Sequence, residues 1–198
     1  MLSWRKPSAE DVQRRLHEQA QLDLTYAAVG ATATSPPAGY VVDHTRVRLG
    51  AGECVFQAAR AALQRWDQLR LGWLEAVPAE APIETGQVVG ILARAAGLWW
   101  LNACRIVYVI DQVTPACRFG FGYGTLPDHA GTGEERFLIE WNPEDNGVWY
   151  DILAFSRPHQ LLIRLGYPLV RRTQKRFGQD SARALRRVVT GGSPADTP

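Results

Sequence analysis

The last third of the chain holds two short segments of alternating polarity, followed by one long, basic, amphipathic segment. The two short segments are residues 133–141 (GEERFLIEW) and 147–155 (GVWYDILAF), and the turn-rich connector NPEDN predicts a β-hairpin between them. Helical periodicity then runs from about Ser156 to about Val189. A hairpin followed by a long closing helix predicts a curved antiparallel sheet that wraps one helix, with room for a ligand between them.

The rest of the chain supplies the other elements of such a fold. Ser8 is expected to cap a first helix over 9–21, and the segment 24–40, rich in glycine and proline, is expected to form a loop. Alternation predicts a strand over 40–49, and apolar spacing predicts a second helix over 53–71. We therefore expect an α+β fold, in which an antiparallel sheet of about seven strands wraps the long C-terminal helix, because the connections are too short for crossovers. Further strands are predicted from β-branched and aromatic runs at 73–77, 86–94, 99–111 and 118–125.

Length and composition fit one globular domain. The chain has 198 residues, of which 46% are hydrophobic and 21% charged, enough for a proper core. We expect one domain over 1–189, including the N-terminal helix and loop at 1–39, followed by a disordered tail at 190–198. The most apolar segment, 97–110, is interrupted by polar residues and is shorter than the roughly 20 residues that span a bilayer. No transmembrane segment or secretory signal is expected, and three widely spaced cysteines favour a cytoplasmic protein with reduced thiols.

Charge is unevenly distributed along the chain. Residues 1–159 contain 14 Lys/Arg and 18 Asp/Glu, whereas residues 160–198 contain 8 and 2. This pattern fits the solvated side of a packed helix, or a surface that contacts an acidic partner or membrane. A weak anionic contact through Arg171, Lys175 and Arg183 is therefore one hypothesis, and these side chains are expected to be exposed and replaceable. No DNA partner is expected, since aromatic residues for base stacking are not interleaved with the charges.

Every second residue of the strand expected near 119–125 is a glycine. Gly120, Gly122 and Gly124 leave one face without side chains, which implies that backbone, a helix or a ligand approaches that face closely. The opposite face carries the side chains of Phe119, Phe121, Tyr123 and Thr125.

Two adjacent glutamates follow in the next strand, and the alternation distinguishes them. Glu135 shares the inward face with Phe137 and Ile139, whereas Glu134 belongs to the other face. Glu135 is therefore expected to be the more buried of the two carboxylates and to be hydrogen-bonded inside the fold, because burial disfavours a charge that has no partner.

Two roles are open for Glu135. It is either a general acid, general base or ligand anchor with Tyr123 or His129 as partner, or a structural group that ties the 126–133 loop or pairs with an arginine. A metal site is not expected, since His129 has no second histidine or cysteine nearby. No cofactor is expected either, because the sequence contains no P-loop, dinucleotide fingerprint or nucleophile elbow.

Several blocks of the sequence, taken in order, resemble one family of bacterial and plant proteins that is catalogued as a domain of unknown function. They are LTYAAVGAT with PPAGY, LGAGECVFQAARAALQRW, GLWWLNACRIVYV, FGYGTLPDHAGTGEERF and AFSRPHQLLIRLGYPLVRRTQKRF, which together cover roughly residues 24–188. The chain departs from that family at Ala27, where proline is usual after LTY. The order of elements is also similar to that of the START-like helix-grip superfamily, which includes the polyketide cyclases and the birch pollen allergen.

The resemblance implies a helix-grip fold but does not choose among functions. The first hypothesis is binding of a small apolar or aromatic ligand in an internal cavity beneath the final helix. The second is an enzyme of cyclase, dehydratase or hydrolase type that uses Glu135 with Tyr123 or His129. The third is an interaction module that docks through the basic helix. Strand alternation and helical phase predict that the cavity is lined by Phe119, Phe121, Tyr123, Phe137, Ile139, Tyr150, Ile152, Leu169 and Phe177.

Overall fold

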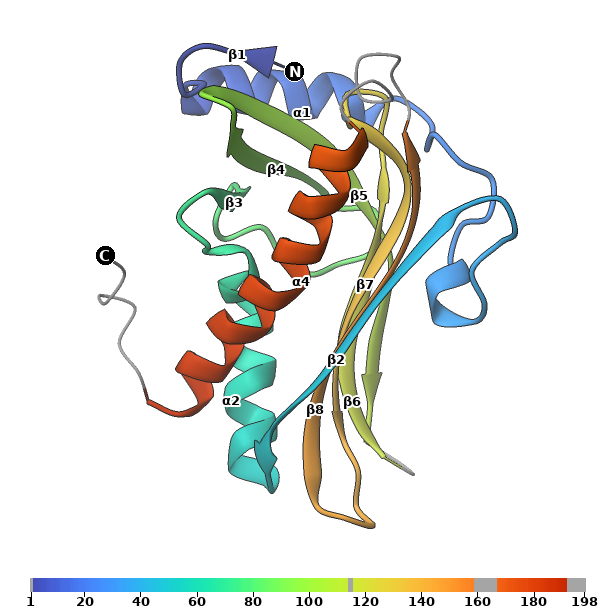
Figure 1. The fold of residues 1–198 in the computed structure, drawn as a ribbon, viewed down its shortest axis with the longest axis vertical. Helices are drawn as coiled ribbons and strands as arrows, with labels where there is room; N and C mark the ends of the chain where they lie inside the picture. Colours follow the sequence, from blue (N-terminus) through green and yellow to red (C-terminus); the bar gives the residue numbers. More distant parts are fainter. Residues whose placement is uncertain (1, 114–115, 159–166, 192–198) are drawn as a thin grey trace.

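The computed structural model describes residues 2–113, 116–158 and 167–191 of the chain. One antiparallel sheet crosses the molecule, and two helices, α2 and α4, lie together on one side of it (Figure 1). The helices are α1 (Ala9–Ala20), α2 (Glu53–Gln64) and α4 (Tyr167–Val189), with short 3-10 turns η1 (Ala31–Ala33) and η2 (Asp67–Leu69). The strands are β1 (Leu2–Ser3), β2 (Val41–Ala51), β3 (Leu74–Val77), β4 (Val88–Ala95), β5 (Leu98–Gln112), β6 (Cys117–Thr125), β7 (Gly131–Trp141) and β8 (Gly147–Pro158).

The expected α+β fold is confirmed. The seven main strands follow the order β2-β8-β7-β6-β5-β4-β3, and the two-residue β1 pairs beside β5. Strands β3 to β8 form an antiparallel meander, and β2 closes the sheet by pairing with β8. The sheet wrapped against its C-terminal helix is the helix-grip arrangement.

The two faces of the sheet are covered differently. The inner face packs against α2, η2 and α4, where most of the buried apolar residues gather. The outer face near β4 and β5 is covered by α1, whose Val12 and Leu16 pack on Leu92 and Leu101. Helix α1 begins as expected, because the Ser8 hydroxyl oxygen accepts a hydrogen bond from the backbone N–H of its first turn at 3.1 Å.

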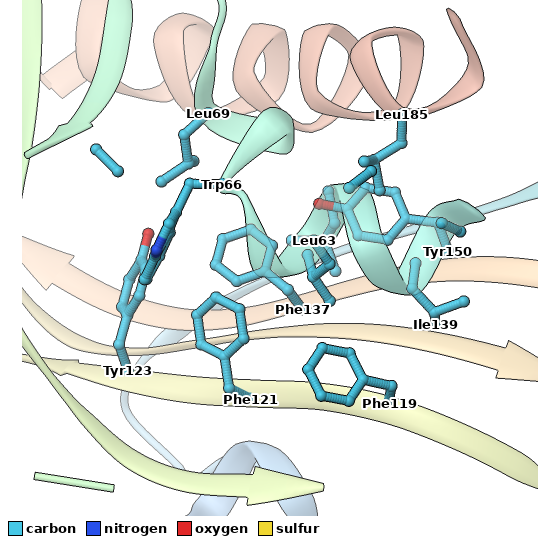
Figure 2. Packing of buried hydrophobic residues seen from close by; sticks show 14 of the residues in the cluster. Leu63, Trp66, Leu69, Phe119, Phe121, Tyr123, Phe137, Ile139, Tyr150 and Leu185 are labelled. Carbon is cyan, nitrogen blue, oxygen red and sulfur yellow. The ribbon is translucent and has the colours of Figure 1, made fainter. Parts of the chain in front are cut away.

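Aromatic rings fill the centre of the inner face (Figure 2). The Phe121 ring lies 4.9 Å from the indole of Trp66 and 5.4 Å from the ring of Phe137, measured between ring centroids. On the helix side, Phe177 of α4 and Phe137 form a T-shaped pair, with the ring centroids 6.2 Å apart. Such edge-to-face and tilted pairs add a directional term to the apolar burial, so this cluster holds α4 against the sheet.

The face of β6 without side chains is filled by two tyrosine rings from the same chain. A Cβ built on Gly122 would lie 2.5 Å from the ring of Tyr108, and one built on Gly124 would overlap the hydroxyl of Tyr26. The expectation of a close approach at these glycines is therefore confirmed, and the group that approaches belongs to the protein itself.

The helix expected over 53–71 is shorter than its apolar spacing indicated. It ends at Gln64, and Trp66 takes a left-handed backbone conformation with φ of 60°. That turn directs the Trp66 indole into the core, where its N–H donates to the Ala81 carbonyl oxygen at 2.8 Å. Trp66 therefore lies just after the end of α2, and its side chain fills the core beneath η2.

The helix expected from Ser156 also begins elsewhere. Ser156 is still in β8, where it pairs with Val41 of β2, and the described helix begins at Tyr167. Pairing with β2 as far as Ser156 and with β7 as far as Pro158 extends β8 beyond residue 155, where the strand was predicted to end, and local periodicity does not show this effect. The side chain of Leu169, one of the expected lining residues, lies outside the described part of the chain, as does the tail from 192 onwards.

Candidate functional site

One transverse row of the inner face brings the candidate residues together. The pairing register places Asp43 of β2 opposite Ala154 of β8, Ala154 opposite Glu135 of β7, and Glu135 opposite Tyr123 of β6. Ile106 of β5 continues the row beyond Tyr123. The row borders the aromatic cluster, because the next row along the same strands contains Phe121 and Phe137.

Glu135 and Tyr123 form a hydrogen-bonded pair in this row. The Tyr123 hydroxyl donates to Glu135 Oε2 at 2.7 Å. Tyr123 is buried, with 6% of its surface exposed, whereas Glu135 retains partial contact with solvent. The expected hydrogen bond of Glu135 inside the fold is therefore confirmed.

The surroundings of this pair favour its protonated forms. Burial raises the pKa of Glu135 to about 7, the Tyr123 hydroxyl lowers it in part, and the Asp43 carboxylate adds to the rise. Burial and the nearby Glu135 carboxylate hold the pKa of Tyr123 well above its ordinary value. The thiol of Cys104, fully buried on the same face, also has its pKa raised by burial and by Glu135. Near neutral pH Glu135 can therefore either donate or accept a proton.

The side chain of His129, the other candidate partner of Glu135, forms a hydrogen bond within its own turn. Its Nδ1 lies 3.0 Å from the backbone nitrogen of Gly131, whose N–H donates to it. The hydrogen bond of Glu135 goes to Tyr123 instead. The structure therefore joins two of the three candidate catalytic residues and places the third in the turn that leads into β7.

Glu134, and not Glu135, is the more deeply buried of the two glutamates, so that expectation was wrong. Glu134 points to the outer face, where only 2% of its surface is exposed. The segment between α1 and β2 crosses the outer face there and encloses the carboxylate. Alternation correctly separated the two faces, but it could not show that a loop covers the outer one.

Four donors from that segment converge on Glu134. Oε2 accepts from the Tyr26 hydroxyl at 2.6 Å and from the Gly30 backbone N–H at 2.7 Å. Oε1 accepts from the Thr32 backbone N–H at 2.8 Å and from the Thr32 hydroxyl. Burial and the Glu134 carboxylate raise the pKa of Tyr26, so its hydroxyl remains a donor at neutral pH. Glu134 therefore fixes the 26–32 segment to the sheet.

Most residues expected to line an internal cavity are buried and pack on one another. Cavities in the described part of the chain include one of about 590 Å³ beside Phe119 and one of about 930 Å³ between α1 and the β3–β4 edge. Residues with at most 6% of their surface exposed are Phe119, Phe121, Tyr123, Phe137, Ile139, Tyr150 and Ile152, and Phe177 is partly buried against them.

A family model described as "Domain of unknown function (DUF1990)" matches residues 25–184. A UPF0548 protein of Dictyostelium discoideum is 35% identical over 207 residues and covers 96% of each chain. A UPF0548 protein of Arabidopsis thaliana is 34% identical over 203 residues, covering 95% of this chain and 97% of that one. The chain belongs to the DUF1990 family. Both glutamate sites lie within the part that the family model matches, and the resemblance expected from the sequence blocks is confirmed.

Solved structures that share the fold are more distant in sequence. The protein TTHA0849 from Thermus thermophilus gives a TM-score of 0.50 at 17% identity, covering 76% of this chain and 98% of that chain. Ara h 8.0201 gives 0.45 at 12% identity, with coverages of 78% and 100%. Norcoclaurine synthase from Thalictrum flavum, in complex with dopamine and hydroxybenzaldehyde, gives 0.46 at 10% identity, with coverages of 89% and 98%. At these low sequence identities, the similarity indicates a shared fold and nothing about function.

Within the described ranges, no group of three or more histidine, cysteine, aspartate or glutamate side chains is arranged to hold a metal ion. None of the helices described has a stretch long and apolar enough to cross a bilayer.

The three basic residues expected to be exposed and replaceable on α4 are not equivalent. Lys175 and Arg183 are exposed, but Arg171 is only 21% exposed and its guanidinium bonds both carboxylate oxygens of Asp43, at 2.5 and 2.6 Å. The helical projection could not show this pair, because Asp43 comes from β2. For Arg171 the expected exposure was therefore wrong, whereas its replacement stays a prediction.

The difference predicts separate effects on stability. Arg171→Gln is expected to lower the free energy of unfolding by roughly 1 to 2 kcal/mol, since a bidentate, partly buried pair is lost and Asp43 keeps an unpaired charge. Lys175→Gln is expected to change it by less than about 0.5 kcal/mol, as for an ordinary surface charge. Urea unfolding of the two variants beside wild type measures both values, and equal effects would contradict the assignment.

Proposed function

We propose that the protein binds a small, largely apolar or aromatic ligand on the inner side of the sheet, with Glu135 and Tyr123 as its polar anchor. The observation that carries the proposal is the state of Glu135. Its partly buried carboxylate lies beside aromatic rings, and the Tyr123 hydroxyl is its hydrogen-bond partner among the described residues.

The charge on Glu135 is poorly compensated. The charge of Asp43, which acts on Glu135 and raises its pKa, is also negative, and Arg171 is engaged by Asp43 in a bidentate pair. A carboxylate in such surroundings is costly unless it is protonated or gains another donor. A ligand hydroxyl or amine group at Oε1 would supply that donor, which supports a ligand with one hydrogen-bonding group on an apolar body.

The neighbouring side chains suit the apolar body of such a ligand. Tyr123 and Phe137 lie with ring centroids 5.4 Å apart next to the carboxylate. Ala154, which faces Glu135 across β7 and β8, carries only a methyl group, so this part of the row has little side-chain bulk. Apolar walls with a few fixed polar groups are typical of small-molecule sites.

A second candidate function, general acid–base catalysis by Glu135, is favoured by one observation. A carboxyl group whose pKa is raised to about 7 can exchange a proton efficiently near neutral pH. An enzyme of the cyclase, dehydratase or hydrolase type would use Glu135 to move the proton and Tyr123 to orient it. Ligand binding requires only that Glu135 and Tyr123 form hydrogen bonds to the ligand, without a chemical reaction, and it is the function that we propose.

The ligand-binding proposal can be tested with N-phenyl-1-naphthylamine, an apolar aromatic amine that fluoresces when it leaves water. Wild-type protein is expected to bind it, and Glu135→Leu is expected to weaken binding by roughly 10-fold or more, the usual effect of losing a hydrogen bond to a charged group. Tyr123→Phe should have a smaller effect, since it leaves the carboxylate in place. Native mass spectrometry of the purified protein gives an independent search for a bound molecule.

The matched control is Glu140→Leu, which removes a carboxylate of the same strand from the outer face. Glu140 bonds Arg46 and Arg118 there, at 2.9 and 2.7 Å. Its replacement should leave dye binding unchanged. Equal affinities of wild type, Glu135→Leu and Glu140→Leu would rule out Glu135 as the anchor, and failure of wild type to bind the dye would count against the site.

A further inference from the structure

The outward face of α4 presents a narrow stripe of positive charge. Its basic side chains recur at spacings of three, four or seven residues, which places them within about 120° of one another around the helix axis. The stripe extends over roughly 22 Å at the rise of an α-helix. Its exposed members are Arg172, Lys175, Arg176, Arg183, Arg186 and Arg187.

These charges are largely uncompensated within the described part of the chain. Arg176 and Arg183 share one carboxylate, that of Asp180, at 3.0 and 3.2 Å. Arg186 donates to a backbone carbonyl oxygen of β2, and Arg172, Lys175 and Arg187 have no carboxylate partner among the residues described.

Several arginines elsewhere on the surface have carboxylate partners. On the outer face Arg46 bonds Glu140 and Asp151, and Arg118 bonds Glu140 as well. On α1, Arg15 bonds both Glu18 and Asp128. Exposed arginines without a carboxylate partner also occur elsewhere in the described residues, at Arg5, Arg48 and Arg94, but these belong to separate segments, whereas α4 carries six exposed basic residues on one helix face.

The stripe is held rigidly because the opposite side of α4 is part of the core. Phe177 packs on Phe137, and the hydroxyl of Ser181 lies 2.8 Å from that of Tyr150. Leu185 is fully buried at the next turn. The charges therefore do not need to be ordered when a partner arrives, which lowers the entropic cost of binding.

We propose that this α4 stripe docks the protein onto an anionic lipid surface. The positive charge of the stripe favours a polyanionic partner. The position of α4, packed against its neighbours, favours a partner with a flat surface. Because α4 packs against β2 and α2, its outward face can contact a flat surface, but the helix does not project as a helix must to enter a DNA major groove (Figure 1). Among the described side chains of α4, the stripe includes no exposed apolar residue to insert, so attraction to acidic headgroups is the binding force.

The surface is distinct from the Glu135 site and does not depend on it. The stripe faces away from the sheet, whereas Glu135 belongs to the inner face that α4 covers. Glu135→Leu should therefore leave membrane docking unchanged, and failure of one proposal would not decide the other.

Co-sedimentation with lipid vesicles tests the docking proposal. Wild-type protein is expected to bind phosphatidylcholine vesicles that contain about one-third phosphatidylserine and to dissociate from them as the salt concentration is raised. It is not expected to bind vesicles of phosphatidylcholine alone. A triple variant, Arg172→Gln, Lys175→Gln and Arg187→Gln, removes the unpaired charges. It should bind roughly 100-fold more weakly, since each basic residue near an acidic bilayer contributes about a factor of five.

The control is a second triple variant with the same change in net charge, Arg5→Gln, Arg14→Gln and Arg94→Gln, which removes exposed arginines outside α4. It should bind nearly as well as wild type, and circular dichroism should show that both variants are folded. Equal loss in the two variants would overturn the proposal, as would binding of wild type to uncharged vesicles. Binding of wild type to duplex DNA or heparin, but not to acidic vesicles, would also overturn it, since it would identify a different class of partner.

Discussion

Replacement of Glu134 by alanine is expected to lower the free energy of unfolding by about 4 kcal/mol or more. The substitution leaves the donors of Tyr26, Gly30 and Thr32 without an acceptor beneath the 26–32 segment. Each buried donor that loses its partner costs roughly 1 to 3 kcal/mol. A loss of this size is a large part of the stability of an ordinary domain.

Urea unfolding followed by circular dichroism measures the effect, and Glu140→Ala is the matched control. Glu140 belongs to the same face of β7, but it is 15% exposed and its partners Arg46 and Arg118 can turn to solvent. Its loss should cost about 1 kcal/mol or less, as for other surface ion pairs. If the two variants were equally stable, Glu134 would not be the group that fixes the segment. Limited proteolysis adds a local test, because cleavage within 24–34 should accelerate in the Glu134 variant alone.

The second large effect is a pH-dependent gain in stability when Glu135 is replaced by glutamine. Burial raises the pKa of Glu135 to about 7 from its ordinary value of 4.5. Between these two values the unfolded chain releases the proton while the folded protein keeps it, so stability falls as pH rises. Above about pH 7 the full penalty applies, roughly 2 to 3 kcal/mol for a group that keeps some contact with solvent.

Glu135→Gln removes this titration, since the amide is neutral at every pH. The variant should therefore match wild type near pH 5 and exceed it by roughly 2 to 3 kcal/mol near pH 8, as measured by urea unfolding at a series of pH values. Glu144→Gln, in the exposed β7–β8 turn, should show no such trend relative to wild type. A difference between wild type and Glu135→Gln that did not change with pH would contradict the raised pKa.

The features that the sequence predicted correctly are those with a local physical cause. Side chains of a strand alternate between faces, so the residue pattern alone placed Phe121, Phe137 and Ile139 on the inner side and Glu134 on the outer side. The glycines of β6 likewise indicated a close approach before the approaching group was known. Turn residues between short strands were enough to indicate an antiparallel sheet, because such connections cannot cross over.

What the sequence left undetermined depends on contacts between distant segments. The burial of Glu134 requires Tyr26 and Thr32, more than 100 positions earlier in the chain, to lie across the sheet. The pairing of Arg171 with Asp43 joins α4 to the edge strand β2 in the same way. Periodicity reports which face a residue occupies, whereas burial and partners depend on what else covers that face, and only the tertiary structure decides this.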